Sequence, residues 1–139
     1  MLLVHARIDL AHGRTDSALR QLELAASLVA ARHQDVNPDA YDIEILRAQT
    51  SMQAGDYVNA AKHATSAAGF ARAGAIDETS SAWVGEALLG RAQAEKALGQ
   101  STAAAADARA ALSQLEPNLL PTHALVIAAR GIAAAHDGG

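Results

Sequence analysis

Six histidines are the side chains of this sequence that could support metal binding or acid–base catalysis near neutral pH. His5 and His12 stand seven residues apart and would share one face of a helix, but no third ligand lies near them in the sequence. The other four are scattered and are expected at the surface or in loops: His33, His63, His123 and His136. We therefore expect no metal site and no cofactor.

Motifs of other catalytic sites are missing as well. The chain has no cysteine, which excludes disulfides, thiolate catalysis and zinc sites built on thiolates. It contains no HExxH, Gly-x-Ser-x-Gly, Ser-x-x-Lys or phosphate-loop pattern. The acidic pairs Asp39/Asp42 and Asp77/Glu78 fall at expected helix N-termini, where negative charge complements the helix dipole. We expect no catalytic residue and no independent enzyme.

The composition favours helices and a soluble chain. Of the 139 residues, 50% are hydrophobic and only 3% aromatic, and alanine, the strongest helix former, makes up roughly a quarter. The net charge of -4, with acids and bases interspersed, offers no basic surface for nucleic acid or an anionic membrane. No apolar stretch is long enough to span a bilayer. The apolar run at the start of the chain is too short for the apolar region of a signal peptide. We expect a cytoplasmic protein or a soluble segment of a larger chain.

A pattern recurs around three glycines, Gly13, Gly55 and Gly99, which stand 42 and 44 residues apart. An alanine follows each of them at the fifth position: Ala18, Ala60 and Ala104. A repeat of this size holds two helices of about five turns and two short loops. We expect each glycine to form the turn within a helix pair, and each of these alanines to lie where two helices touch.

Apolar spacing and capping residues predict seven helices. Four of the expected helices cover residues 2–12, 38–54, 78–98 and 122–135. The other three follow an N-cap residue: one runs from Thr15 or Asp16 to residue 32, one from Asp56 to 73, and one from Ser101 to 115. Asn37 and Asp77 are the expected N-caps of the third and fifth helices, and Gly74 should end the fourth in the left-handed conformation.

The skeleton Ala-x6-Gly-x4-Ala-x3-(Leu/Ala)-x2-Ala resembles the tetratricopeptide repeat, a pair of antiparallel helices with small residues where they pack. The resemblance covers residues 2–35, 39–75 and 78–117, and residues 122–135 look like the first helix of a fourth repeat. It implies one domain over residues 1–139, an all-α, right-handed superhelical solenoid of antiparallel helix pairs.

The sequence also departs from this family. Its large aromatics are mostly missing apart from Tyr57, and the period exceeds the usual length of about 34 residues. Such long repeats resemble those of kinesin light chains, of large bacterial transcription activators and of the tails of bacterial serine/threonine kinases.

In the tetratricopeptide family the first helix of each pair lines a concave groove that holds a peptide or a partner helix. Carried over by position, the resemblance implies groove residues in three helices: Leu3, Arg7 and Leu10; Asp42, Ile45, Gln49, Met52 and Gln53; Glu86, Leu89, Gln93 and Lys96. Gln49 and Gln93 occupy equivalent positions, where an amide can both donate to and accept from a peptide backbone. The Lys and Asn pairs of the chaperone-binding members are missing, which argues against a chaperone C-terminus as ligand. The alternative is an ordinary solvated helix face.

Arginines recur at one position of the first helices, as Arg47, Arg91 and Arg130. We expect them to pair with acids inside the molecule, such as Glu44 or Glu95, rather than to form a basic row for an acidic partner. Trp83 is expected to pack against the preceding helix pair rather than to serve as a ligand platform.

The resemblance implies a scaffold or adaptor that binds a peptide or partner protein, without direct contact to nucleic acid or membrane. Self-association is one alternative, because both end helices are apolar: Met1 to Val4 at the start, and Leu125, Val126, Ile127 and Ile132 near the end. A regulatory segment of a larger transcription regulator or kinase that senses a small ligand is another, and it predicts a closed pocket. The sequence leaves these alternatives open.

Overall fold

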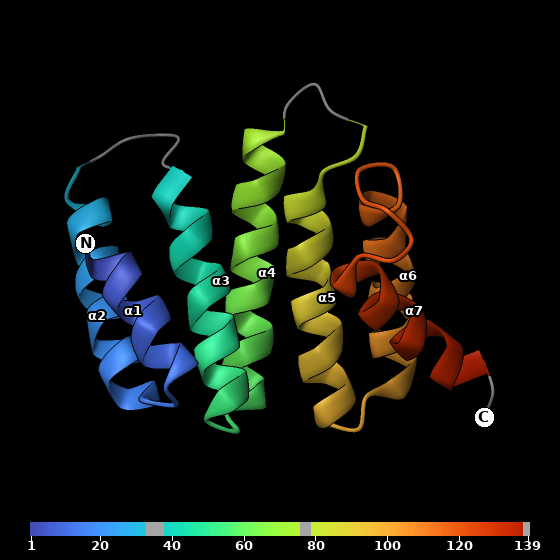
Figure 1. Cartoon of the computed structure of the whole chain (residues 1–139), viewed down its shortest axis with the longest axis horizontal. Helices are drawn as coiled ribbons and strands as arrows, with labels where there is room; N and C mark the ends of the chain where they lie inside the picture. The colour runs from blue at the N-terminus through green and yellow to red at the C-terminus, as the bar shows by residue number, and fades with distance from the viewer. Residues whose placement is uncertain (33–37, 76–78, 138–139) are drawn as a thin grey trace.

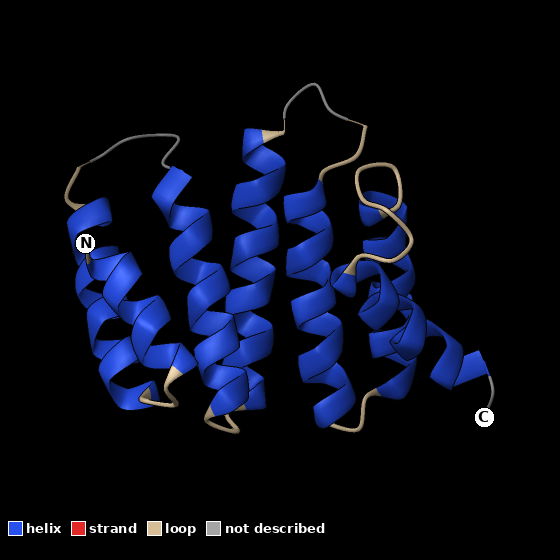
Figure 2. Ribbon diagram, viewed as in Figure 1, coloured by secondary structure: helices blue, strands red, loops and turns tan. Residues whose placement is uncertain are grey.

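The computed structural model describes residues 1–32, 38–75 and 79–137, and these form helices and connecting turns without any strand (Figures 1 and 2). The helices of this part of the chain are α1 (Leu2–Ala11), α2 (Thr15–Ala30), α3 (Pro38–Gln53), α4 (Tyr57–Gly74), α5 (Ala82–Ala97), α6 (Ser101–Leu115) and α7 (Ala124–Asp137). The all-α prediction is therefore confirmed. None of these helices combines the length and the apolar character that a membrane span requires.

The helices stand in one row, with the two chain termini at opposite ends (Figure 1). Each helix packs against the next one in the sequence. The odd-numbered helices also touch one another, α1 with α3, α3 with α5 and α5 with α7. These helices therefore share one face of the row, and side chains from successive odd-numbered helices can meet there.

The three repeated glycines have the backbone conformation that the sequence predicts for tight turns. Gly13, Gly55 and Gly99 have φ angles of 72°, 78° and 78°, in the left-handed region that favours glycine. At each turn the glycine N–H donates to the carbonyl three residues earlier, at 3.0 to 3.1 Å. The N–H of the residue after the glycine donates to the carbonyl four residues before the glycine, at 2.8 to 2.9 Å. Each odd-numbered helix before α7 thus ends in the same C-terminal cap, and all three turns lie along the same edge of the row, at the bottom of Figure 1.

Small residues bring the two helices of each pair together. The alanines five residues after the glycines, Ala18, Ala60 and Ala104, are at most 1% exposed. Gly85 in α5 is a second close approach, since a Cβ atom there would lie 2.6 Å from the Leu115 side chain of α6. The core consequently combines many alanines with larger side chains such as Leu22 and Leu115.

Two of the expected helix caps are wrong. Thr15 and Ser101 are the first residues of α2 and α6, and the cap positions belong to Arg14 and Gln100, neither of which makes a side-chain cap bond. The helices follow the glycine turns so closely that the residue after each glycine is already the cap. Asp56 does cap α4 as expected, because its carboxylate accepts a hydrogen bond from the Asn59 N–H.

The junction between α4 and α5 also differs from the prediction. Gly74 is the last residue of α4 rather than a left-handed cap, and Ala75 follows at φ -104°. Helix α5 does not begin at Glu78 but at Ala82, where the Ser81 side chain accepts a hydrogen bond from the Val84 N–H. The other cap predictions at Asn37 and Asp77 lie outside the described residues. Helix α7 runs two residues later than expected at both ends.

Trp83 packs on the preceding helix pair, as expected. Its ring stacks on Tyr41 of α3 with a centroid distance of 5.7 Å. The Tyr41 hydroxyl donates to the Trp83 carbonyl and to a Glu86 carboxylate oxygen, both at 3.2 Å. Tyr41 therefore ties the start of α3 to the first turn of α5.

Candidate binding groove

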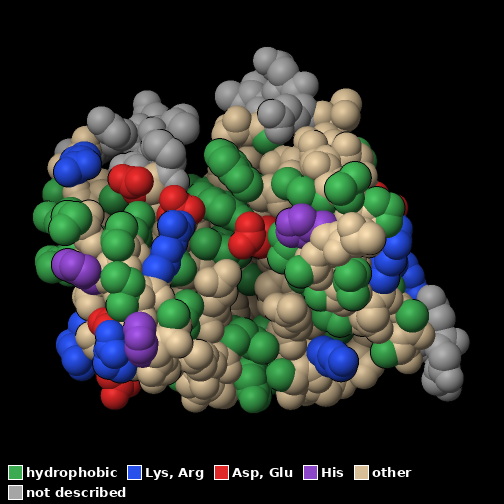
Figure 3. Space-filling view, viewed as in Figure 1, with side chains coloured by type: hydrophobic (Ala, Val, Ile, Leu, Met, Phe, Trp, Pro, Cys, Tyr) green, Lys and Arg blue, Asp and Glu red, His purple; other side chains and the backbone are tan. Residues whose placement is uncertain are grey.

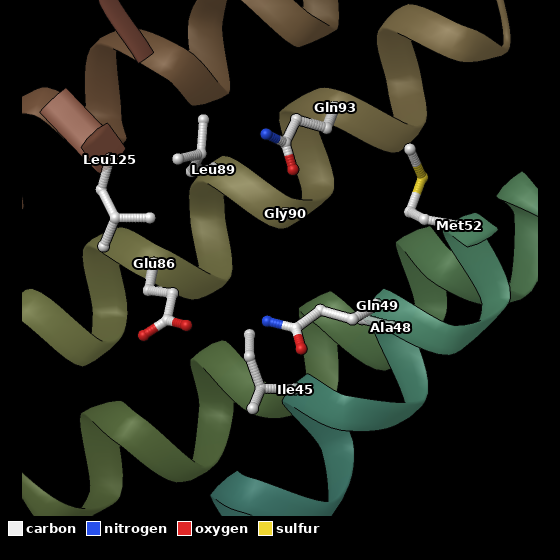
Figure 4. A pocket seen from close by; sticks show the side chains of 9 residues that line it. All are labelled: Ile45, Ala48, Gln49, Met52, Glu86, Leu89, Gly90, Gln93 and Leu125. Carbon is white, nitrogen blue, oxygen red and sulfur yellow. The ribbon is translucent and has the colours of Figure 1, made fainter. Parts of the chain in front are cut away.

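A pocket of about 220 Å³ opens between α3 and α5, and α7 closes one side of it. Figure 4 shows the nine side chains that line it: Ile45, Ala48, Gln49, Met52, Glu86, Leu89, Gly90, Gln93 and Leu125. Six of these residues belong to the groove that the family resemblance implies: Ile45, Gln49, Met52, Glu86, Leu89 and Gln93. The pocket therefore unites the expected positions of the second and third repeats.

The odd-numbered helices position these side chains through their shared register. Gln49 and Gln93 each lie six residues before a turn glycine, and both are exposed at the rim. Ile45 and Leu89 lie one helical turn earlier and are 6% and 2% exposed, so they form an apolar floor. The pocket thus has an apolar base and an open rim that carries amide groups.

Glu86 is the one ionisable side chain among the described residues that line the pocket. One of its carboxylate oxygens accepts the hydrogen bond from Tyr41. Burial raises the pKa of Glu86, and the negative charge of Asp42 adds to the effect, whereas the Tyr41 hydrogen bond, Arg7 and His123 oppose it. A negative charge at this position is therefore poorly solvated.

The expected groove residues of α1 do not reach this pocket. Arg7 instead forms an ion pair with Asp42 of α3 at 3.5 Å. Leu3 lines a separate cavity between α1, α2 and α3, and Leu10 packs against the core. The first helix therefore borders the site through the Arg7–Asp42 pair rather than lining it.

Three further expected positions do not line the pocket either. Asp42 is paired with Arg7 and is not part of the lining. Gln53 is exposed at the end of α3 and does not line the pocket. Lys96 borders a small cavity formed with Ile132 and Ala135 of α7. Lys96 therefore lies beside α7 and outside the pocket between α3 and α5.

Three features of the pocket are not apparent from the sequence pattern. Ala48 and Gly90 form part of its wall, Leu125 of α7 enters it, and Tyr41 fixes the carboxylate of Glu86 from outside the lining. The likeness of α7 to a first helix was the signal for Leu125, since such helices face the groove. Nothing in the repeat pattern marks Tyr41.

The recurring arginines pair with acidic groups inside the molecule, as expected. Arg47 bonds Glu44 at 2.9 Å, Arg91 forms a bidentate pair with Asp107 of α6, and Arg130 bonds Glu116 at 2.8 Å. His63 also lies 2.8 Å from Glu44. Burial alone would raise the pKa of Glu44, but the hydrogen bonds from His63 and Arg47 hold it below its usual value. The partner of Arg91 is Asp107 rather than the expected Glu95.

Polar side chains four residues before the turn glycines form a second set of equivalent positions: Asp9, Ser51 and Glu95. Asp9 is 8% exposed and accepts hydrogen bonds from Arg14, Ser17 and Gln21 at 2.5 to 2.7 Å. These bonds, first those from Ser17 and Arg14, lower its pKa. Glu95 instead has a buried carboxylate oxygen with no hydrogen-bond partner among the described residues. Burial and the neighbouring negative charge of Asp107 raise its pKa to about 7.

Within residues 1–32, 38–75 and 79–137, no three acidic or histidine side chains come together in a way that could hold a metal ion. His12 lies 2.8 Å from the Ile8 carbonyl and His63 contacts Glu44, so these two rings have local partners.

No model of a known protein family, no curated protein and no solved structure matches this chain. The resemblance to the tetratricopeptide repeat therefore depends on the residue pattern alone, and the function must be argued from the geometry of the site.

Proposed function

We propose that this chain is a protein-interaction module of the tetratricopeptide kind, a right-handed superhelical scaffold or adaptor that works in the cytoplasm. In this proposal a segment of a partner protein lies across the pocket between α3 and α5, and the chain acts by binding rather than by catalysis. The observation that carries the proposal is the meeting of Gln49 and Gln93, from equivalent positions of two repeats, at the rim of one apolar pocket.

The composition of this site suits an extended peptide. Ile45 and Leu89 offer apolar surface to a side chain of the partner, while the two amides can satisfy backbone N–H and C=O groups that would otherwise lose water. Because Gln49 and Gln93 are exposed, the pocket opens to solvent. An open site favours a peptide groove over the closed pocket that a small-ligand sensor would need.

Selection from a random peptide library displayed on phage, with the purified chain as bait, tests this proposal. Sequences that bind should then lose about tenfold in affinity toward the double variant Gln49→Ala/Gln93→Ala, because each amide contributes a hydrogen bond of modest net strength. The matched control is Gln53→Ala, which removes an exposed amide of α3 outside the pocket. A library that yields no binders, or an equal loss in the control, contradicts the proposal.

A second candidate function, self-association, is favoured by the exposed apolar side chains of α1 and α2: Met1, Val4, Ile8, Leu24 and Leu28, which are 45% to 89% exposed. Counted from the turn glycines, the first three correspond to positions of α3 that are at most 4% exposed: Ile43, Leu46 and Thr50. Helix α3 is packed against α2 as well as α4, whereas α1 contacts α2 and α3 alone among the described helices. This face of α1 therefore has the character of a helix interface without its partner, which a second copy of the chain would cover.

Light scattering after size-exclusion chromatography over a concentration series tests this second candidate. A dimer should form at high concentration and should be lost in Val4→Glu/Ile8→Glu, because two charges would be buried unpaired in the interface. Val58→Glu is the control, since Val58 is equally exposed but lies on α4. A mass of about 14.3 kDa at every concentration excludes self-association through this face.

A further inference from the structure

The charge of the pocket between α3 and α5 distinguishes among the segments that could occupy it. Glu86 is the charged residue of the lining, and none of the other eight lining residues is Lys, Arg or His. In the view of Figure 3, acidic side chains lie at the edge of a recess in this face. Figure 4 shows the Glu86 carboxylate directed into the space that it shares with Gln49 and Ile45.

The surroundings of Glu86 leave its charge only partly compensated. Tyr41 on α3 supplies one hydrogen bond, and it is a neutral donor. Asp42, also on α3, is a second negative charge near Glu86, but its carboxylate is paired with Arg7 of α1. His123, in the connection before α7, is the other nearby titratable group. A partner that covers Glu86 would therefore bury a carboxylate that has no charged partner in the pocket lining.

This arrangement discriminates strongly by charge. A purely apolar side chain placed over Glu86 would remove water from the carboxylate without replacing its interactions, which is a costly form of burial. An acidic side chain would add repulsion to the same cost. A cationic side chain instead forms a charge-assisted hydrogen bond and repays the lost hydration.

The shape of the pocket suits a cation on a long apolar stem. Its volume of about 220 Å³ is below the range of roughly 300 to 1,000 Å³ typical of small-molecule pockets, which suits one long side chain. Ile45 and Leu89 form the floor and Leu125 one wall. Lysine and arginine combine such a stem with a charged end.

We propose that this pocket selects a partner segment bearing a lysine or arginine, whose charged end pairs with Glu86 while its stem lies on Ile45 and Leu89. The inference rests on the proposed function, because it names the class of segment that the same groove binds. The amides of Gln49 and Gln93 hold the backbone of that segment, and Glu86 sets its register.

The phage library described above also tests this inference. Peptides selected on the wild-type chain should share Lys or Arg at one position flanked by apolar residues, and selection on Glu86→Gln should lose that preference. Selected peptides without a basic position, or the same preference on Glu86→Gln, overturn the inference while the proposed function stands. A library without any binder overturns the proposed function, and the inference falls with it.

Titration of one selected peptide provides the quantitative test. Glu86→Gln should weaken its binding by about 10- to 100-fold, because the variant keeps the size and the Tyr41 acceptor but loses a charge-assisted bond. Glu23→Gln makes the same charge change at an exposed site on α2 and should leave affinity unchanged. A loss of similar size in both variants indicates a general charge effect and overturns the pairing with Glu86.

The pH dependence separates a direct ion pair from a structural role. Wild-type affinity should fall as the pH drops through the raised pKa of Glu86, because protonation removes the charge that binds the cation. Glu86→Gln should show no such fall. His123→Asn, which keeps a polar group where His123 accepts the Leu125 N–H, should retain the wild-type profile. A profile that follows His123 instead of Glu86 overturns the proposal.

Discussion

The first and third turns of the molecule share one backbone and differ in the side chains packed against it. Gly13 and Gly99 have φ angles of 72° and 78° and the same pair of capping hydrogen bonds. Four residues before them, Asp9 has a low pKa and three hydrogen-bond donors around it, whereas Glu95 has a pKa of about 7 beside Asp107. Equivalent carboxylates thus have opposite electrostatic environments.

The difference originates in the second helix of each pair. Ser17 and Gln21 stand four and eight residues after Gly13 and donate to Asp9. The corresponding positions after Gly99 are Ala103, which has no donor, and Asp107, which is already paired with Arg91. The glycine turn fixes where the carboxylate lies. The residue after the glycine, Arg14 or Gln100, and two residues of the following helix determine whether its charge is stabilised.

The largest expected effect tests whether the two helix pairs share the same close packing. Ala18→Leu and Ala104→Leu should each destabilise the fold by about 1 to 3 kcal/mol, because both alanines are almost fully buried and extra methyl groups have no space. Thermal or denaturant unfolding measures the loss. Ala106→Leu, at an exposed position of α6, is the control. If the two variants lose unfolding free energy by amounts that differ more than twofold, the packing of the two helix pairs is not equivalent.

A smaller effect tests the shared backbone of the two turns. Gly13→Ala and Gly99→Ala should cost about 1 to 2 kcal/mol each and by similar amounts, since a side chain is strained at these positive φ angles. Gly69→Ala, inside α4 with open space around it, should instead stabilise by about 0.5 to 1 kcal/mol. Chemical denaturation of the three variants gives the values. A neutral substitution at either turn would mean that the left-handed conformation is not required there.

The smallest effect concerns the two carboxylates and appears as a dependence on pH. Because the folded pKa of Glu95 is raised from 4.5 to about 7, the free energy of unfolding should fall as the pH rises through this range. Glu95→Gln should remove this fall and be more stable than the wild type above pH 7, on the order of 1 kcal/mol after allowance for partial solvent exposure.

Asp9 should behave in the opposite sense. Its folded pKa is lowered, so its contribution is complete above its ordinary value of 3.8 and is lost as the pH falls through the folded value. Asp9→Asn should remove that acid sensitivity and leave the fall that Glu95 causes between about pH 4.5 and 7 unchanged. Unfolding curves of both variants between pH 2 and 8 check the pair, and equal slopes would contradict the contrast between the turns.

The sequence was a good guide wherever one residue type has one physical role. Only glycine adopts the conformation at Gly13, Gly55 and Gly99 without strain, so the turns and the helix order could be predicted from them. Alanine at Ala18 and Ala60 likewise marks positions without room for a larger side chain. Six residues of the pocket could be named because the family resemblance assigns their positions to a groove.

Prediction failed where several residues compete for one role. Ser81 and Asp77 are both good caps, and the start of α5 at Ala82 uses Ser81, whose side chain receives the Val84 N–H. Gly74 is compatible with a left-handed cap and with a last helical residue, and the structure has it as the last residue of α4. The pairing of Arg91 with Asp107 and the bond from Tyr41 to Glu86 connect residues far apart in the sequence. Such contacts depend on how helices are placed side by side, which local patterns do not specify.

All three glycine turns lie at the same end of their helix pairs, which has a consequence for how the repeat changes length. Helices α3 and α5 have 16 residues each, and α2 has 16 where α4 has 18. The connections after α2 (residues 31–37) and after α4 (residues 75–81) have the same length. The spacing from Gly55 to Gly99 is therefore longer than that from Gly13 to Gly55 because α4 is longer than α2. The position of the turns is therefore kept, and the two extra residues of α4 lengthen this helix by about 3 Å at the end away from the turns. Insertions and fusions are accordingly best placed at that opposite end, away from the pocket and from the three turns.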